Sequence, residues 1–428
     1  MLGTYAVTIF QSKSAQPATK MNATSCDFIQ PKLNTRPGYP SMLPEPVFFS
    51  GHHGLKIKDA DATFDAYRCR DLFSCHQDIL ATKIGSKARA FILCDPTVYN
   101  LYGSQMRRCL DHHQIESYYF PLPAAEPYET VKTSRTVDDL VKDLWPYHLG
   151  GEDKIVICGG GATLDVCKYV ANFFRRKITG YIAIPTTLVA VVDAAISSKF
   201  AINVDRFKNA LGDVWHPQAV LYDPKLLESV STQSFQDGLA EIVKLAIIGD
   251  QNLFMCLEDM PLPGLRESLC SEHADAMLQR CIYLFSALKW TGPCWGNEPA
   301  SIRAFGHKFS RVLEGTSDYR ITHGRAVAVE MVVAVNLAAN CGVLQQNDRD
   351  SIQACLRRLQ LPSYCDECQP DTLWHEAFER SFTLNRNFYF PAPSSVGVGT
   401  FLDRFSLEDL SRAIEEAKGF ETIIQLAE

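Results

Sequence analysis

The sequence predicts an N-terminal α/β domain with a doubly wound sheet, followed by an all-α C-terminal domain. Up to about Pro224, short apolar runs of strand length alternate with helical periodicity, which is the pattern of a mostly parallel sheet covered by helices. Beyond Pro224 the strand-like runs fade and long amphipathic stretches dominate. A third observation is the run of three glycines at 159–161, which joins a predicted strand to a predicted helix.

The composition is that of a globular chain. It has 428 residues, of which 46% are hydrophobic and 21% charged, which is enough for two ordinary domains. The net charge of −7 argues against a nucleic-acid partner, because phosphate neutralisation needs a basic face. No stretch approaches the roughly 18–20 apolar residues of a membrane span. The 15 cysteines are scattered through apolar runs, so we expect a reducing compartment and a cytoplasmic location.

The first 46 residues have few acids, many Ser, Thr, Pro and Asn residues, and a proline-rich end. We interpret them as a disordered extension, with a weak organellar transit peptide as the alternative. The predicted α/β domain then covers residues 47–224 and the predicted helical domain covers residues 225–428.

Each element follows from its own pattern. The predicted strands of the first domain are short and apolar, at 90–94, 117–121, 154–158 and 180–184. Helical periodicity in this domain covers 137–144 and 164–174. The amphipathic stretches of the second domain lie at 235–248, 272–288, 302–313, 326–340, 348–359 and 406–418.

The glycine turn predicts a site for an anionic ligand. Glycines there let the backbone approach a phosphate, and the following helix directs its free N–H groups at it. Asp95 follows one predicted strand, and Thr186 and Thr187 follow another, so a dinucleotide is favoured over an empty turn. The run lacks the GxGxxG fingerprint, which disfavours an ordinary Rossmann dehydrogenase.

A carboxylate and two imidazoles form a candidate metal set. Glu241 lies on a predicted helix with Lys244 three residues on, His307 opens another helix, and His323 precedes the helix 326–340. This donor set suits zinc or a similar ion and leaves positions open for substrate oxygens. Taken singly, each histidine is better explained as a helix cap or a surface residue.

Several cations near these elements form a candidate phosphate pocket, namely Lys199, Lys208 and Lys244, with Asn209 beside them. Solvated surface lysines are the alternative. Lys199 resists that alternative because it follows the apolar run 189–196, where a charge needs a partner.

Taken together, these motifs resemble the dehydroquinate-synthase-like sugar phosphate cyclases over roughly residues 47–418. The motifs that carry the resemblance are Gly159-Gly-Gly161 with Asp165, Pro185-Thr-Thr-Leu188, Asp193-Ala194, Lys199, Asn203, Lys208-Asn209, Gly238-Leu-Ala-Glu-Ile-Val-Lys244, Gly306-His307 and His323-Gly324. The resemblance implies a dehydroquinate synthase-like fold, tightly bound NAD, and a divalent metal, Zn²⁺ or Co²⁺. It also implies transient oxidation of a substrate hydroxyl, phosphate elimination and closure of a carbocycle by aldol addition.

The resemblance assigns roles residue by residue. Glu241, His307 and His323 match metal ligands. The positions that match cofactor contacts are Asp95, Glu126, Gly160, Gly161, Asp165, Thr186 and Thr187, with which Lys208 and Asn209 of the phosphate pocket are grouped. The positions that match substrate and catalytic contacts are Asp193, Lys199, Lys244, Lys289 and Arg386. A homodimer that binds a small sugar phosphate is also implied.

The exact cyclase depends on three positions. Ala304 and Arg311 replace the Asn and the second His of true dehydroquinate synthases, which favours the cyclases that act on sedoheptulose 7-phosphate. Ala304 favours the desmethyl-4-deoxygadusol type over the 2-epi-5-epi-valiolone type, whereas Asn385 matches neither. The alternatives are a 3-dehydroquinate synthase, a metal-dependent polyol dehydrogenase of the glycerol type, which Lys168 fits better, and a catalytically silent scaffold.

Overall fold

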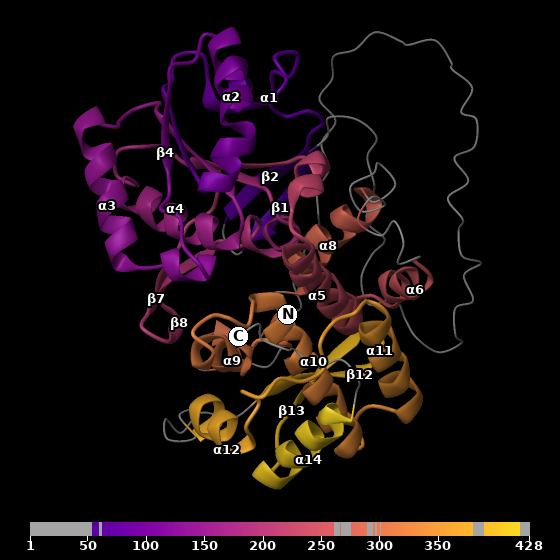
Figure 1. Ribbon diagram of the computed structural model, residues 1–428. Helices are drawn as coiled ribbons and strands as arrows, with labels where there is room; N and C mark the ends of the chain where they lie inside the picture. The colour runs from indigo at the N-terminus through magenta and orange to yellow at the C-terminus, as the bar shows by residue number, and fades with distance from the viewer. Residues whose placement is uncertain are drawn as a thin grey trace, which may run out of the picture.

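The computed structural model describes residues 54–59, 62–260, 275–288, 301–379 and 389–419, with short pieces at 266, 294–295 and 298–299. In Figure 1 a sheet with helices α1–α4 forms one side of the molecule, and the helices from α9 onward form the other. The predicted N-terminal extension, residues 1–46, lies outside the described residues.

A seven-stranded sheet organises the first half of the chain in the order β1-β2-β9-β6-β5-β3-β4. All neighbours pair in parallel except β1 and β2, which are antiparallel. The strands are β1 (Gly54–Asp59), β2 (Ala62–Arg68), β3 (Ala90–Cys94), β4 (Ser117–Pro121), β5 (Lys154–Gly159), β6 (Tyr181–Pro185) and β9 (Ala219–Tyr222). The predicted fold class is confirmed.

The sheet is buried on both faces, which explains its continuous apolar strands. Phe91 and Leu93 of β3 pack in the core that also holds α3 and α4, whereas Ile92 packs in a second core with α1 and α2. The helices are α1 (Ile79–Ile84), α2 (Pro96–His112), α3 (Ser134–Leu144) and α4 (Gly161–Phe173).

The order of the strands reverses between β3 and β5. From β3 the chain passes outward to β4, and it then returns to β5 on the other side of β3. Ligands of open α/β sheets bind at such a point, outside the carboxyl ends of the strands. Asp95 and Gly160 follow these two strands directly, so the topology places them at the same crevice.

The second half of the described chain is dominated by helices around α10, whose side chains are almost all buried. Helix α10 packs against α5, α9, α11 and α14. The helices are α5 (Thr232–Gly249), α6 (Gln251–Asp259), α8 (Asp275–Ala287), α9 (Ser310–Thr316), α10 (His323–Asn340), α11 (Gln346–Arg358), α12 (Pro370–Leu373) and α14 (Leu407–Lys418). Within the described residues, no helix has the length and apolarity that a membrane crossing needs.

Three features differ from the sequence prediction. The helical half also contains an antiparallel hairpin of β12 (Phe390–Ser395) and β13 (Val398–Leu402). The sequence does not predict this hairpin, because β12 contains two prolines and proline is rare inside strands. A second hairpin joins β7 (Lys199–Val204) to β8 (Phe207–Val214). The predicted helix 302–313 is divided into a 3₁₀ turn, η7 (Ile302–Ala304), and α9, because Gly306 between them has φ +75°.

Candidate metal and cofactor site

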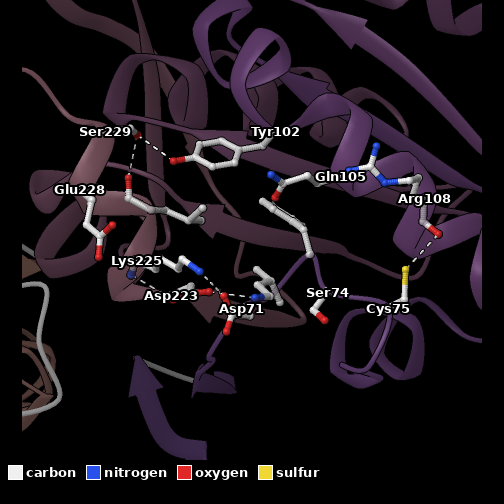
Figure 2. Close-up of a pocket in the computed structure, with 13 residues that line it drawn as sticks. Asp71, Ser74, Cys75, Tyr102, Gln105, Arg108, Asp223, Lys225, Glu228 and Ser229 are labelled. Carbon is white, nitrogen blue, oxygen red and sulfur yellow. Dashed lines mark hydrogen bonds and ion pairs between the residues drawn. The ribbon is translucent and has the colours of Figure 1, made fainter.

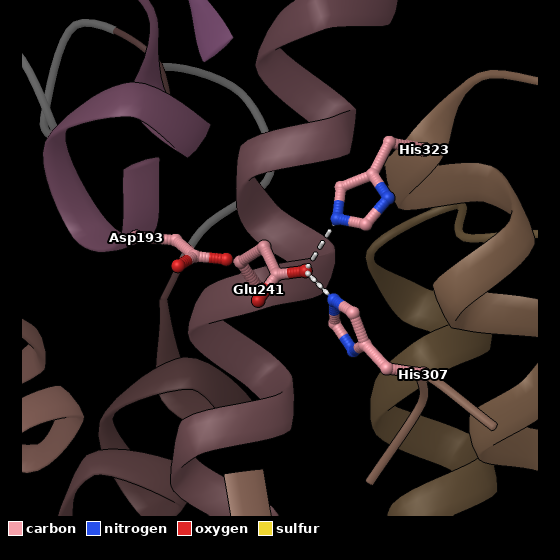
Figure 3. A group of neighbouring side chains, drawn as sticks. All are labelled: Asp193, Glu241, His307 and His323. Atoms are coloured by element: carbon pink, nitrogen blue, oxygen red, sulfur yellow. Dashed lines mark hydrogen bonds and ion pairs between the residues drawn. The ribbon is translucent and has the colours of Figure 1, made fainter. Parts of the chain in front are cut away.

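Four side chains converge between the two halves of the molecule. Asp193, Glu241, His307 and His323 each direct a potential ligand atom to one point, and these atoms lie within 4.8 Å of one another. Figure 3 shows Glu241 on α5 between Asp193 on one side and the two imidazoles on the other. The sequence named these four residues, and the structure brings them together.

The geometry of this cluster fits a metal ion. Oε1 of Glu241 lies 3.1 Å from Nε2 of His323 and 3.5 Å from Nε2 of His307. Ligands about 2.1 Å from a tetrahedral ion are about 3.4 Å apart. Two imidazoles and one carboxylate therefore suit zinc or a similar divalent ion, and they leave coordination positions for substrate.

Two glycines allow the elements of the cluster to approach. A Cβ on Gly238 of α5 would lie 2.3 Å from Cβ of Leu188, and a Cβ on Gly324 of α10 would lie 2.2 Å from Cα of Asp237. No side chain fits at either place. The Thr322 hydroxyl also donates to Asp237 across 2.6 Å, which fixes the start of α10 and with it His323.

Charge and burial set the protonation of the ligands. Burial opposes ionisation of Glu241, but Lys244 and the imidazoles outweigh it and hold the pKa of this carboxyl well below its usual range. Burial, with Lys244 nearby, holds the pKa of His307 well below its usual range. Burial raises the pKa of Asp193, and the charge of Glu241 adds to that rise. An ionised carboxylate and a neutral imidazole are the forms that bind metal.

Glu314 of α9 supports the cluster from outside, and the sequence analysis assigned it no role. Its Oε1 lies 3.1 Å from Nδ1 of His323, so the other ring nitrogen is directed at Glu241. A carboxylate on the far nitrogen of a histidine ligand fixes its tautomer and orientation. Burial opposes protonation of His323, but Glu314 raises its pKa to about 9, so a metal ion that binds this ring displaces a proton from it.

A chain of buried and partly buried charges runs from Glu314 toward the glycine turn. Lys208 forms ion pairs with Glu314 and, across 3.5 Å, with Glu129. Glu129 lies 3.1 Å from Nζ of Lys132, and Lys132 donates to Asp165 of α4 across 2.7 Å. We call these five residues and His323 the charge chain. Asn209, 2.6 Å from Nζ of Lys132, lies beside it.

The predicted cofactor residues lie at the carboxyl ends of β3, β5 and β6. Asp95 caps α2 by accepting from the N–H of Val98 across 2.8 Å, and the N–H of Gly160 also faces this carboxylate. Burial raises the pKa of Asp95. A Cβ on Gly160 would lie 3.0 Å from the Thr187 side chain. The crevice therefore offers an acceptor and helix-end N–H groups of the kind that hold a dinucleotide.

The structure does not bring every predicted residue to this group. Glu126 is exposed, whereas Glu129 and Lys132 of the same segment belong to the charge chain. Lys199 is also exposed, so the preceding apolar run does not bury it. Gly161 begins α4 and Thr186 follows β6, as predicted. Lys289 and Arg386 lie outside the described residues, as does Asn385.

A separate surface pocket of about 610 Å³ lies elsewhere, between α2 and the turn after β9. Figure 2 shows its polar lining, which includes Asp71, Tyr102, Lys225 and Ser229. None of the predicted site residues lines this pocket.

Comparison with known proteins identifies the family. The family models for the N-terminal and C-terminal parts of 3-dehydroquinate synthase match residues 123–237 and 238–379. The chain belongs to the 3-dehydroquinate synthase family. The resemblance seen in the sequence is confirmed, and with it the expectation of an enzyme of this family.

Its relatives carry the names of three different activities. A 2-epi-5-epi-valiolone synthase from Actinomyces is 30% identical over 80% of this chain and 90% of the relative. A demethyl-4-deoxygadusol synthase from Trichormus variabilis is 28% identical, over 83% of this chain and 87% of the relative. A 3-dehydroquinate synthase from Nitratiruptor is 30% identical, over 82% of this chain and 97% of the relative. These identities do not separate the three activities.

A solved structure supplies the ligands of one relative. The 2-epi-5-epi-valiolone synthase of Streptomyces hygroscopicus, with NAD⁺ and Zn²⁺ bound, is 26% identical to this chain and superposes with a TM-score of 0.76. The match covers 85% of this chain and 98% of the other. The cluster described above offers donors of the kind that such a metal requires.

Proposed function

We propose that the chain is an NAD- and divalent-metal-dependent cyclase that converts sedoheptulose 7-phosphate into a carbocycle with loss of phosphate. The product is desmethyl-4-deoxygadusol or 2-epi-5-epi-valiolone. The observation that carries the proposal is the convergence of Glu241, His307 and His323 beside Asp193, in a chain of this family. Ala304 and Arg311 support this substrate over that of dehydroquinate synthase.

The proposed roles follow from the contacts. Glu241, His307 and His323 hold the metal, and Asp95, Gly160, Gly161, Asp165, Thr186 and Thr187 line the NAD crevice. When bound, the ion would acidify a coordinated hydroxyl group and NAD would accept and return a hydride. Lys244 lies 2.5 Å from Oε2 of Glu241, so it can donate to a substrate oxygen next to the metal position. Asp193 accepts a hydroxyl proton on the opposite side.

The phosphate end of the substrate is assigned to the remaining cations. Lys199, Lys289 and Arg386 are proposed there, since Lys208 is already paired with two carboxylates. An exposed Lys199 is compatible with a phosphate that is recruited from solvent. We further propose a homodimer in the cytoplasm, in keeping with the free thiols of the described cysteines.

The test is an assay of the purified protein with NAD and Zn²⁺ or Co²⁺. Sedoheptulose 7-phosphate and 3-deoxy-arabino-heptulosonate 7-phosphate are offered separately, and phosphate and product mass are followed. Phosphate with a cyclitol from the first substrate supports the proposal, and the mass separates the two products. Turnover of the second substrate alone would identify a 3-dehydroquinate synthase, and net NADH release would identify a polyol dehydrogenase.

A further inference from the structure

Lys168 of α4 is a fully buried lysine that contacts two main-chain carbonyls. Its side chain has no exposed surface, and Nζ donates to the carbonyl oxygens of Ala194 and Ser197, the latter across 3.0 Å. The first carbonyl belongs to the last residue of the π-helical turn η3 (Ala190–Ala194), and the second lies three residues beyond it. Asp193 of the metal cluster is the residue before Ala194.

The end of this turn needs a donor. The last carbonyls of a helical segment have no N–H partner further along the helix, and water cannot reach most of this buried segment. The chain leaves η3 and enters β7 at Lys199, so the carbonyls of Ala194 and Ser197 lie where the helical pattern ends. An ammonium group supplies several N–H donors there, and its charge is favourable at the negative end of a helical turn.

The surroundings allow Lys168 to remain charged without a carboxylate in contact. Burial lowers its pKa to about 8, while the nearby charges of Asp165 and Asp193 oppose that fall. A pKa near 8 still leaves most of the population protonated at neutral pH. The lysine is therefore a cationic donor to the turn under ordinary conditions.

The same turn also touches the beginning of α4. A Cβ on Gly161 would lie 3.9 Å from Cβ of Ala194, so the glycine turn of the cofactor crevice is adjacent to Asp193. Lys168 lies two helical turns after Gly161, and long side chains on helices extend toward the N-terminus. Its ammonium thus holds the Asp193 turn against the helix that begins at the crevice.

We propose that Lys168 is a positioning residue that fixes Asp193 relative to the cofactor crevice. The inference rests on the proposed function for the role of Asp193 and on the contacts above for the geometry. The hydrogen bonds of the Lys168 ammonium go to main-chain carbonyls and not to the proposed metal ligands. Lys168 acts through the backbone of residues 194–197, and its loss lets the Asp193 carboxylate leave the position in which it meets the substrate.

The first experiment measures the turn directly and needs no substrate. Hydrogen exchange of the holoenzyme is compared among the wild type, Lys168→Met, Lys168→Arg and Val170→Ala. Val170 is equally buried, lies two residues further along α4 and serves as the matched control. We expect at least tenfold faster amide exchange within 190–198 in Lys168→Met, partial rescue by Lys168→Arg, and no such local change in Val170→Ala. Unchanged exchange in Lys168→Met would overturn the proposal.

The second experiment uses kinetics in a double-mutant cycle. Lys168→Met should lower kcat at least tenfold with the KM for NAD changed less than twofold, and it should add little to the loss caused by Asp193→Asn. Multiplicative losses would overturn the proposal, as would a loss of NAD affinity. If Lys168→Met does not fold, Lys168→Gln, which retains an amide donor, replaces it in both experiments. A wild type that is silent on both substrates would refute the proposed function, while the exchange experiment would still decide the role of Lys168.

Discussion

Nδ1 of His323 lies 3.1 Å from Oε1 of Glu314, and this contact directs the opposite nitrogen of the ring toward Glu241. Glu314 is buried, and burial alone would disfavour its charge, but Lys208 and His323 hold its pKa well below the usual range. A permanently ionised carboxylate therefore supports the imidazole from behind.

Removal of this support should weaken metal binding. We expect Glu314→Gln to lower the affinity for Zn²⁺ about 10- to 100-fold, since loss of such an outer carboxylate has that effect. Competition with a chromogenic chelator measures the affinity. Glu415→Gln on the exposed face of α14 is the control and should leave it unchanged. Equal affinities in the two variants would refute the supporting role of Glu314.

The metal and the cofactor should be separable by mutation. His307→Ala removes one of three proposed metal ligands but none of the residues in the NAD crevice, so the variant should lose its stoichiometric metal and retain NAD. Elemental analysis measures the metal content, and NAD titration of the same preparation measures the binding of NAD. Phosphate release should fall by more than 100-fold and should not recover on addition of Zn²⁺. A variant with a full complement of metal would exclude His307 as a ligand.

Glu129 and Glu126 offer a comparison within one segment. Glu129 belongs to the charge chain and faces Lys132, whereas Glu126 is exposed. We expect Glu129→Gln to weaken NAD binding about tenfold, because Lys132 and Lys208 would each lose a charge partner beside the crevice. Glu126→Gln should change the affinity less than twofold by calorimetric titration. The reverse result would restore Glu126 as the cofactor contact that the sequence predicts.

The close contact at Gly324 should limit substitution there. A methyl group on this residue would overlap the backbone at Asp237, so Gly324→Ala should lower the free energy of unfolding by about 1–3 kcal/mol. Metal affinity should fall as well, since His323 precedes this glycine. At Gly150 no heavy atom lies closer than 4.0 Å to the new carbon. Gly150→Ala should therefore leave unchanged both the free energy of unfolding, measured by chemical denaturation, and the metal affinity, measured by competition with a chelator.

Glu330 predicts a dependence of stability on pH. This carboxylate is buried under the start of α9 and accepts from the N–H groups of Lys308, Phe309 and Ser310. Burial raises its pKa from the ordinary 4.5 to about 7, against the lowering effect of those N–H groups. Between these values the folded state binds more protons than the unfolded state, so stability from this group is present below pH 4.5 and is lost as the pH rises through 7.

The measurement is urea unfolding at pH 5 and pH 8. From pH 5 to pH 8 the free energy of unfolding should fall by about 1–3 kcal/mol more in the wild type than in Glu330→Gln, because the glutamine side chain does not titrate. Asp237, whose pKa burial raises to about 6, contributes equally to both proteins. Parallel pH profiles would contradict the prediction.

Much of the fold and part of the site follow from the sequence. The strands β3 to β6 and the helices α4, α5, α10 and α14 are visible as apolar runs and periodicity, because burial of one face leaves a regular pattern. The convergence of Glu241, His307 and His323 came from the family resemblance, since no spacing rule joins residues so far apart.

The charge chain could not be predicted in the same way. Lys208 and Glu314 are 106 residues apart, and the sequence predicts a phosphate-pocket lysine at the first position and no role for the second. Their burial depends on a partner that only the tertiary structure supplies. For the same reason the apolar run before Lys199 did not predict its exposure at the start of β7.

The signs along the charge chain alternate from Glu314 through Lys208, Glu129 and Lys132 to Asp165. Loss of any one member removes a charge partner from a neighbour, and breaking such a pair costs more than the pair itself contributes. The charge chain should therefore tolerate paired replacements that keep local neutrality better than single replacements. A library that varies these positions one at a time would contain few active members, whereas a library that varies neighbouring positions together would contain many more.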